Sequence, residues 1–162
     1  MSDFLTCIDN SLSETIKYDE RKEINEPKTG QKIVLSTHGR YLIYTLDKDY
    51  FRAFPYFKEV EHLNSVCDYI IFTEKDEVPY IILIELKGKN SPLKQLTAGE
   101  HFCDFIMKRI NVAHKRNFKP IVRKVGVMKK ARGSTNIGDV KYNENGEVLV
   151  PYQCLQLDAF VK

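Results

Sequence analysis

The sequence predicts an α/β domain in which helices flank a mixed β-sheet. Its 162 residues are enough for one domain with a sizeable core. Hydrophobic residues make up 43% and charged residues 29%, which is typical of a globular chain rather than a disordered one. Strand-like and helix-like patterns alternate along the chain, and this alternation favours an α/β class.

The N-terminal segment is predicted to begin with a helix. Residues suited to helix capping occur from Asp9 onward, and Leu12 and Ile16 lie four positions apart, as on one helix face. We expect this helix to run toward Ile24, where a segment with proline and glycine ends it.

Two short strands are expected next. Residues 32–36 and 41–46 are rich in β-forming side chains, and the short polar segment between them favours a hairpin. Residues 47–65 carry an aromatic cluster that a proline interrupts, so they receive no assignment.

The centre of the chain carries the clearest strand signals. Residues 66–72 and 80–87 read as strands, and residues 73–78 read as a charged turn between them. The unbroken apolar run at 80–84 predicts a central strand that is covered on both faces.

A helix and further strands complete the predicted order. Ser91 is a suitable N-cap and Pro92 a suitable first helical residue for a helix that ends near Asn111. Residues 120–127 then resume a strand, and residues 152–160 can form a last one.

The charge distribution and the cysteines indicate the cellular environment expected for the protein. Residues 1–86 carry 10 Lys/Arg against 16 Asp/Glu, whereas residues 87–162 carry 15 against 6. The four cysteines show no C-x-x-C spacing and are expected to be reduced. With no long apolar run and acidic residues near the N-terminus, we expect a cytoplasmic protein without a membrane segment.

Three charged residues stand out because they lie in or beside apolar strands. Asp68 and Glu85 would be costly to bury without a cation or strong donors. Lys87 is two residues after Glu85, which places both side chains on one face of a strand. If the strands pair antiparallel, Asp68 joins them, and paired carboxylates suit a hard cation such as Mg²⁺. Lys87 can then orient or help deprotonate an attacking water.

This pattern resembles a known family. Asp68, a spacer of 16 residues and Glu85-Leu86-Lys87 on a hairpin before a helix look like the core motif of the PD-(D/E)XK nuclease superfamily. The resemblance implies a restriction-endonuclease-like αβββαβ core over about residues 9–130, with residues 131–162 as a C-terminal strand extension of one domain at 1–162.

The resemblance also implies roles for individual residues. Asp68, Glu85 and the backbone carbonyl of Leu86 would bind Mg²⁺, with Mn²⁺ as a possible substitute, and Lys87 would be the catalytic lysine. The alternative for Asp68 is a carboxylate that caps a backbone N–H, and for Glu85 and Lys87 a same-face ion pair.

Further members of the site are expected from the flanking helices. Many relatives add an acidic residue from the first helix, for which Glu14 is the best match and Glu20 the second. Gln95 stands where some members use a glutamine. The sequence departs from the family pattern at Cys67, where a proline is expected, and at Gly99, where one subgroup has tyrosine.

A basic stretch follows the proposed catalytic strand. Residues 87–132 hold 13 Lys/Arg against only Glu100 and Asp104, and residues 108–132 are expected to line a groove that leads to the carboxylates. The alternative is a solvated surface. The candidate nucleic-acid-binding residues are Lys89, Lys115, Arg116, Lys119, Arg123, Lys129, Lys130 and Arg132.

The resemblance thus implies a small Mg²⁺-dependent nuclease in repair, recombination or defence, with DNA favoured over RNA as the substrate and the choice between the two left open. Relatives of this size often act as dimers, so a homodimer or a larger complex is expected. The alternative is a catalytically inactive nuclease-fold protein that binds nucleic acid or serves as an assembly subunit. Substrate shape, endo- or exonuclease action and the choice between Glu14 and Glu20 stay open.

Overall fold

The structure, a computed structural model, describes residues 3–18, 23–26, 30–46, 64–87, 91–129, 136, 138–151 and 154–162. Its elements are, in chain order, α1 (Asp3–Asp9), the 3-10 helix η1 (Glu14–Ile16), β1 (Glu23–Glu26), β2 (Gln31–Ser36), β3 (Tyr41–Thr45), β4 (Tyr69–Lys75), β5 (Val78–Lys87), α2 (Leu93–His114), β6 (Ile121–Met128), β7 (Glu147–Pro151), β8 (Leu155–Gln156) and the 3-10 helix η2 (Leu157–Ala159). The predicted α/β class with a mixed sheet is confirmed.

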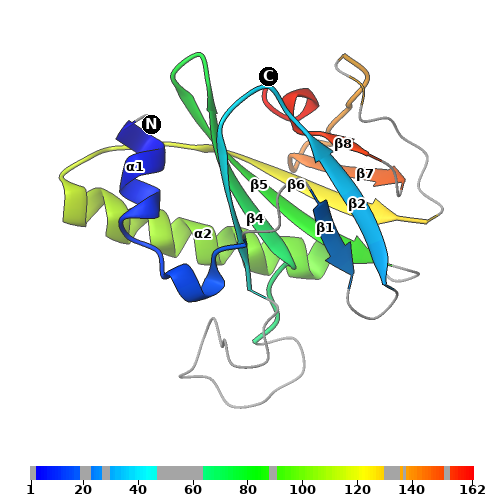
Figure 1. The fold of residues 1–162 in the computed structure, drawn as a ribbon, viewed down its shortest axis with the longest axis horizontal. Helices are drawn as coiled ribbons and strands as arrows, with labels where there is room; N and C mark the ends of the chain where they lie inside the picture. The colour runs from blue at the N-terminus through cyan, green and yellow to red at the C-terminus, as the bar shows by residue number, and fades with distance from the viewer. Residues whose placement is uncertain are drawn as a thin grey trace.

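Five strands form the larger sheet, in the order β3-β4-β5-β6-β7, and β1-β2-β8 form a smaller one (Figure 1). The β4–β5 hairpin turns at Asp76 and Glu77, whose φ angles of 50° and 64° match a tight two-residue turn. β5, β6 and β7 run parallel, and α2 connects β5 to β6. β5 is buried from Tyr80 to Leu86, so the expectation of a central, doubly covered strand is confirmed.

Both α-helices pack on one face of the larger sheet. The apolar residues of α2 recur at helical spacing, as at Leu96, Cys103 and Ile110, and they share a core with Ile81 and Leu83 of β5. The N-terminal helix α1 lies beside the C-terminal end of α2 (Figure 1). The N-terminal end of α2 therefore lies near the carboxyl ends of β5 and β6.

The smaller sheet covers the opposite face. Ile82 and Ile84 of β5 pack there with Ile33 and Leu35 of β2, because successive strand residues point to opposite faces. The domain thus has three layers: helices, the five-stranded sheet and the three-stranded sheet.

The predicted first helix is wrong in its position. The helix α1 ends at Asp9, before the expected start, and of the residues described from there to Tyr18 only the short η1 is helical. Backbone pairing with β3 explains the difference: Lys17 bridges Tyr44, and the N–H of Tyr18 donates to the carbonyl of Ile43 at 2.9 Å. These extended residues cannot also continue a helix toward residue 24.

The predicted hairpin of residues 32–46 is also wrong. Both strands exist, but β2 belongs to the smaller sheet and β3 to the larger one. Asp158, far along the chain, holds the crossing between them: its carboxylate accepts from Thr37 Oγ1 at 3.1 Å and from the backbone N–H of His38 at 3.0 Å.

The predicted C-terminal strand is wrong in its extent. β7 ends at Pro151, which has no backbone N–H to donate, and β8 covers only two residues beside β2 before η2 begins. No helix in the described ranges is long and apolar enough to span a membrane. The unassigned aromatic segment lies mostly outside the described residues.

Candidate active site

The pairing of β4 with β5 places Asp68 next to Glu85. The strands are antiparallel, and the last pair in register on this side is Tyr69 with Ile84. One position further, the backbone N–H of Asp68 donates to Glu85 Oε2 at 3.0 Å. The predicted antiparallel pairing is confirmed, and it brings Asp68 and Glu85 into contact.

The three charged residues lie on the face of the sheet that carries the α-helices. Leu83 packs in the core beneath α2, and every second residue of β5 points the same way, which includes Glu85 and Lys87. Lys87 Nζ lies 2.6 Å from Glu85 Oε1. The ion pair that sequence reasoning kept as an alternative is therefore present.

Glu85 is held in an unusually apolar position for a carboxylate. Its side chain is 2% exposed, whereas that of Lys87 is 26% exposed. Burial and the neighbouring charge of Asp68 raise the pKa of Glu85 to about 8, against the lowering effect of the hydrogen bond from Lys87. Such a strongly perturbed group beside a second carboxylate is typical of a functional site.

Leu86 connects the two carboxylates through its backbone. Its N–H donates to Asp68 Oδ2 at 2.7 Å, so the capping alternative for Asp68 is also met. The N–H and C=O of one strand residue point toward the same neighbouring strand. The carbonyl of Leu86, a predicted metal ligand, is therefore directed to the side of Asp68.

Cys67 and Gly99 set the distance between α2 and the site. A Cβ on Gly99 would lie 2.6 Å from Cys67 Sγ, so only glycine allows α2 this approach. Burial, with smaller contributions from Cys103, Glu85 and Asp68, raises the pKa of the Cys67 thiol well above its usual range. The two departures from the family pattern thus pack against each other.

The first turns of α2 extend over the strand next to Glu85. Gly126 of β6 is the register partner of Glu85, and a side chain there would overlap Pro92. Gln95 is half-buried and lies one turn before Gly99, on the same face of the helix. The structure thus places Gln95 on the side of α2 that faces the site.

The structure does not bring Glu14 to the site. Glu14 starts η1, its side chain is 74% exposed, and it pairs with Lys17 at 3.4 Å. Among the described residues, no hydrogen bond or ion pair links it to Asp68 or Glu85, so its predicted role has no support. Glu20, the second choice, lies outside the described residues.

The predicted basic groove is wrong for several of its members. Arg116 pairs with Asp3 of α1 at 2.7 Å. Arg123 points to the opposite face of the sheet, where it lies 4.6 Å from the ring of Tyr142 and donates to the carbonyl of Lys162 at 3.2 Å. Their partners come from elements distant in sequence, which the run of charges did not reveal.

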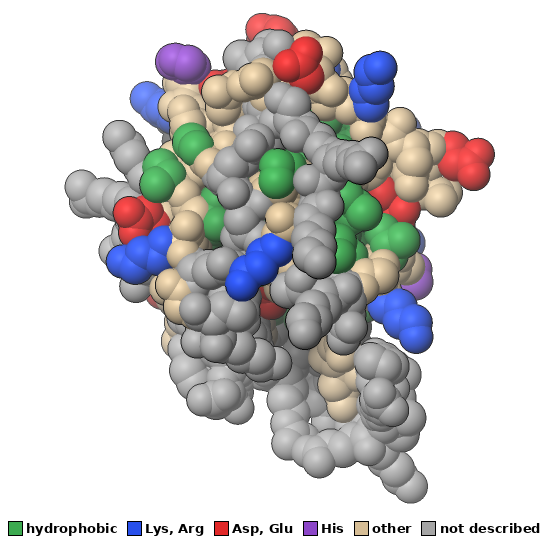
Figure 2. Space-filling view, turned by 90° about the vertical axis from the view of Figure 1, so that its right-hand side faces the viewer, with side chains coloured by type: hydrophobic (Ala, Val, Ile, Leu, Met, Phe, Trp, Pro, Cys, Tyr) green, Lys and Arg blue, Asp and Glu red, His purple; other side chains and the backbone are tan. Residues whose placement is uncertain are grey.

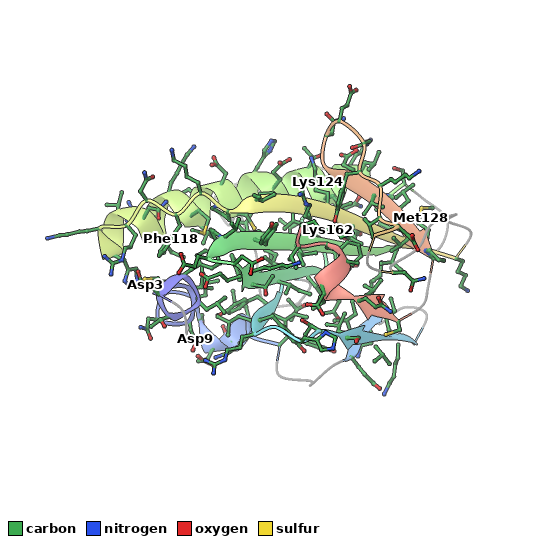
Figure 3. All side chains as sticks on the ribbon, turned by 90° about the horizontal axis from the view of Figure 1, so that it is seen from above. Asp3, Asp9, Phe118, Lys124, Met128 and Lys162 are labelled. Carbon is green, nitrogen blue, oxygen red and sulfur yellow. The ribbon has the colours of Figure 1, made fainter. Side chains whose placement is uncertain are left out.

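Two more members lie far from the carboxylates along the fold. Lys115 follows the end of α2 and Lys119 lies beyond it, whereas the carboxylates lie near its start. At 1.5 Å per residue, the 22-residue helix separates these ends by about 33 Å. Figure 3 shows the same separation, with Asp3 at one end of the molecule and Met128, the register partner of Lys87, at the other.

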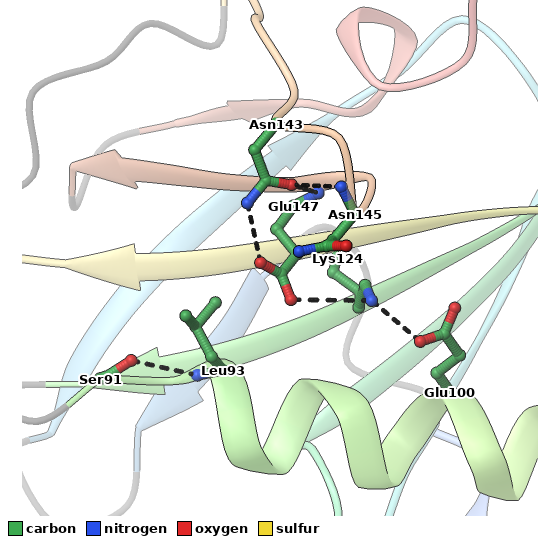
Figure 4. A network of polar contacts seen from close by, with 7 residues as sticks. All are labelled: Ser91, Leu93, Glu100, Lys124, Asn143, Asn145 and Glu147. Carbon is green, nitrogen blue, oxygen red and sulfur yellow. Dashed lines mark hydrogen bonds and ion pairs between the residues drawn. The ribbon is translucent and has the colours of Figure 1, made fainter.

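Lys124, also in the basic stretch, is buried within a network of polar contacts (Figure 4). Its Nζ lies 2.9 Å from Glu100 Oε2 of α2 and 3.6 Å from Glu147 Oε1 of β7. Asn143 holds Glu147 in turn, by a hydrogen bond of 2.8 Å. The network connects α2 with β6 and β7. Because its ammonium is buried in this network, Lys124 is not accessible to a phosphate.

Among the residues that the structure describes, two further lysines lie at the end of the domain that carries the carboxylates. Lys129 is exposed and follows β6 at the edge where β5 ends. Lys94 is exposed in the first turn of α2, and sequence reasoning overlooked it. The sequence feature that could have identified Lys94 is a positive charge in the first turn of a helix, where the helix dipole disfavours positive charge. On the side seen in Figure 2, the Lys and Arg side chains drawn in colour stand apart from one another. Lys89, Lys130 and Arg132 lie outside the described residues.

A separate cavity of about 530 Å³ opens along the distal part of α2. Its lining includes His101, Asp104, Asn111, Phe118 and Lys119. None of the residues that line it belongs to the carboxylate site.

The donor set of the carboxylate site fits Mg²⁺ better than zinc. Two carboxylates and one carbonyl are hard oxygen ligands, and Mg²⁺ commonly binds to one or two carboxylates while it keeps several waters. Structural zinc requires four protein ligands, mostly nitrogen and sulfur. Within the described ranges no group of three or more His, Cys, Asp and Glu side chains is placed to hold a metal ion.

Comparison with known proteins adds no relative. The chain matches no protein-family model, and no curated protein and no solved structure is significantly similar to it.

Proposed function

We propose that the protein is a metal-dependent nuclease that hydrolyses phosphodiester bonds of nucleic acid, with DNA as the preferred substrate. One observation carries the proposal: Glu85 is 2% exposed, contacts the backbone of Asp68 and pairs with Lys87 on one face of a central strand. The resemblance of this motif to that of the PD-(D/E)XK nucleases supports the same proposal.

The residues would divide the work as follows. Asp68, Glu85 and the Leu86 carbonyl would hold Mg²⁺, which when bound supplies positive charge to the reacting phosphate. Lys87 would orient the attacking water, and Gln95 would support it from α2. The water oxygen forms a bond to phosphorus, the ester bond to one sugar oxygen breaks, and that oxygen takes up a proton.

Nucleic acid would approach the end of the molecule where β5 and β6 finish. Lys94 and Lys129 are exposed cations at this end within the described part of the chain, and phosphate contacts of this kind give affinity without sequence preference. Lys89, Lys130 and Arg132 belong to the same proposal. A duplex substrate would need two such sites, so we propose a homodimer, testable by light scattering with and without DNA.

The test is a cleavage assay with matched substrates. Supercoiled, linear and branched DNA and a structured RNA are incubated with the protein in Mg²⁺, Mn²⁺ or EDTA. We expect cleavage of DNA in Mg²⁺ and none in EDTA, with loss of at least about a hundredfold in Glu85→Gln and Lys87→Ala. Glu144→Gln, at an exposed turn, is the control that should retain activity. Cleavage that persists in EDTA would overturn the proposal.

A second function has its own support. The carboxylates of Asp68 and Glu85 accept backbone N–H groups, and Lys87 already neutralises Glu85, as in a structural network. A nuclease-like protein that binds nucleic acid without cleaving it would keep such a network. Binding to DNA without cleavage in any metal would favour this alternative.

A further inference from the structure

The chain's own donors already contact the carboxylates of the candidate site. Glu85 Oε1 binds the ammonium of Lys87 at 2.6 Å, and Glu85 Oε2 accepts the N–H of Asp68 at 3.0 Å. Asp68 Oδ2 accepts the N–H of Leu86 at 2.7 Å. A cation that enters this site must therefore compete for carboxylate oxygens.

These three donors differ in how easily they can move away from the carboxylates. The N–H groups of Asp68 and Leu86 belong to the backbone at the paired ends of β4 and β5. Lys87 holds its charge on a flexible four-carbon stem and is 26% exposed, so its ammonium can reach water without a change in the backbone.

We propose that Lys87 occupies the cation's place on Glu85 in the metal-free protein and is displaced when a divalent cation binds. This inference rests on the proposed function, because it concerns the same metal site. One ammonium leaves Glu85 Oε1 as one cation arrives, so the buried carboxylate is never left without positive charge.

The displacement gives Lys87 two successive partners. Without metal it pairs with Glu85, whose side chain is 2% exposed, and so favours the ionised form of this buried carboxylate. With metal bound, its ammonium lies within one side-chain length of the site and is released toward the phosphate of a substrate. Lys87 therefore lowers the affinity of the site for the cation.

Direct titration of Mn²⁺ into the full chain, followed by calorimetry, tests the competition. Lys87→Met removes the competing ammonium but keeps the length of the side chain, and should bind Mn²⁺ about tenfold more tightly than wild type. Lys87→Arg keeps the charge and should show no gain. Lys108→Met removes a similar ion pair, 2.7 Å from Asp104 on the exposed face of α2, and should bind as wild type does. Thermal unfolding establishes that each variant is folded.

Amine labelling gives a second readout. Acetylation of Lys87, quantified by mass spectrometry, should rise severalfold in Mn²⁺, while that of Lys108 should stay constant. Equal or weaker Mn²⁺ binding in Lys87→Met, or Lys87 labelling that does not rise, would overturn the inference. In that case Mg²⁺-dependent cleavage that requires Glu85 would leave the proposed function intact, whereas absence of Mn²⁺ binding in every variant would overturn both.

Discussion

Leu86 donates its backbone N–H to the carboxylate of Asp68 at 2.7 Å, although the two residues lie 18 positions apart. In an antiparallel ladder this N–H would ordinarily meet a backbone carbonyl. The last pair in register is Tyr69 with Ile84, so beyond it the Asp68 side chain takes over that task. Asp68 therefore has a structural role in addition to the proposed metal-binding one.

Two substitutions at Asp68 separate these roles. Asp68→Ala leaves the N–H of Leu86 without this acceptor and should lower the free energy of unfolding by about 1–3 kcal/mol. Asp68→Asn keeps an acceptor oxygen and should cost less. Both should lose metal-dependent cleavage. Urea unfolding and the cleavage assay check this, and Asp68→Ala with wild-type stability would contradict the structural role.

Glu85→Gln should abolish cleavage without lowering the stability of the protein. The amide still accepts the N–H of Asp68 and removes the cost of a buried charge, so stability should stay within about 1 kcal/mol of wild type or rise. Cleavage should fall to background because a neutral amide is a poor ligand for a hard cation. Thermal unfolding measures the first effect. A collapse of the fold would show that the ion pair with Lys87 is required for stability.

Gly99→Ala tests the contact between α2 and the site. In an unobstructed helix the change would stabilise by roughly 1 kcal/mol. Here the new Cβ would overlap Cys67 Sγ, and we expect a loss of about 1–3 kcal/mol instead. Urea unfolding therefore tests the contact by showing whether Gly99→Ala raises or lowers the free energy of unfolding.

Two further variants control for the Gly99 result. Gly39→Ala, where the nearest side-chain atom to the new Cβ is 3.7 Å away, should be nearly neutral. Cys67→Ala should restore part of the stability lost in Gly99→Ala, because it removes the sulfur. Additive effects of the two changes would rule out the contact.

The sequence pattern was sufficient to bring Asp68 and Glu85 together because their contact is local. Asp68 and Glu85 lie on consecutive strands joined by a two-residue turn, so strand periodicity alone sets their register. The same local logic predicted α2 and the buried run in β5. Each of these elements depends on neighbours close in the chain.

The failures share a different cause. Residues 32–46 looked like a hairpin, but β2 pairs with β1 and β8 whereas β3 pairs with β4. Asp158, more than a hundred positions away, accepts hydrogen bonds from the segment that connects β2 to β3. The basic groove failed because Arg116 and Arg123 take partners from the two ends of the chain. A pattern of residue types indicates which side chains carry charge, but tertiary packing decides which partner they meet.

Asp158 offers a pH-dependent test of that long-range link. Burial would raise its pKa, but hydrogen bonds from His38 and Thr37 outweigh burial and lower it. A carboxylate with a lowered pKa in the folded state stabilises above its unfolded value, near 4, and loses that effect as pH falls through the folded value.

Asp158→Asn should therefore destabilise the protein by about 1–2 kcal/mol at pH 7, and the difference from wild type should shrink below about pH 4. Asp104→Asn, on the exposed surface of α2, is the control and should show a small effect at both pH values. Urea unfolding at the two pH values measures both differences. A gap that stays constant with pH would contradict the role of the charge.

We propose that Asp68 and Glu85 together hold a divalent cation. The most direct measurement is anomalous diffraction from a crystal soaked in Mn²⁺. We predict one strong peak in contact with carboxylate oxygens of both residues, with the ammonium of Lys87 moved away from Glu85. A crystal that shows no peak there at saturating Mn²⁺, with Lys87 still bound to Glu85, would rule out this metal site.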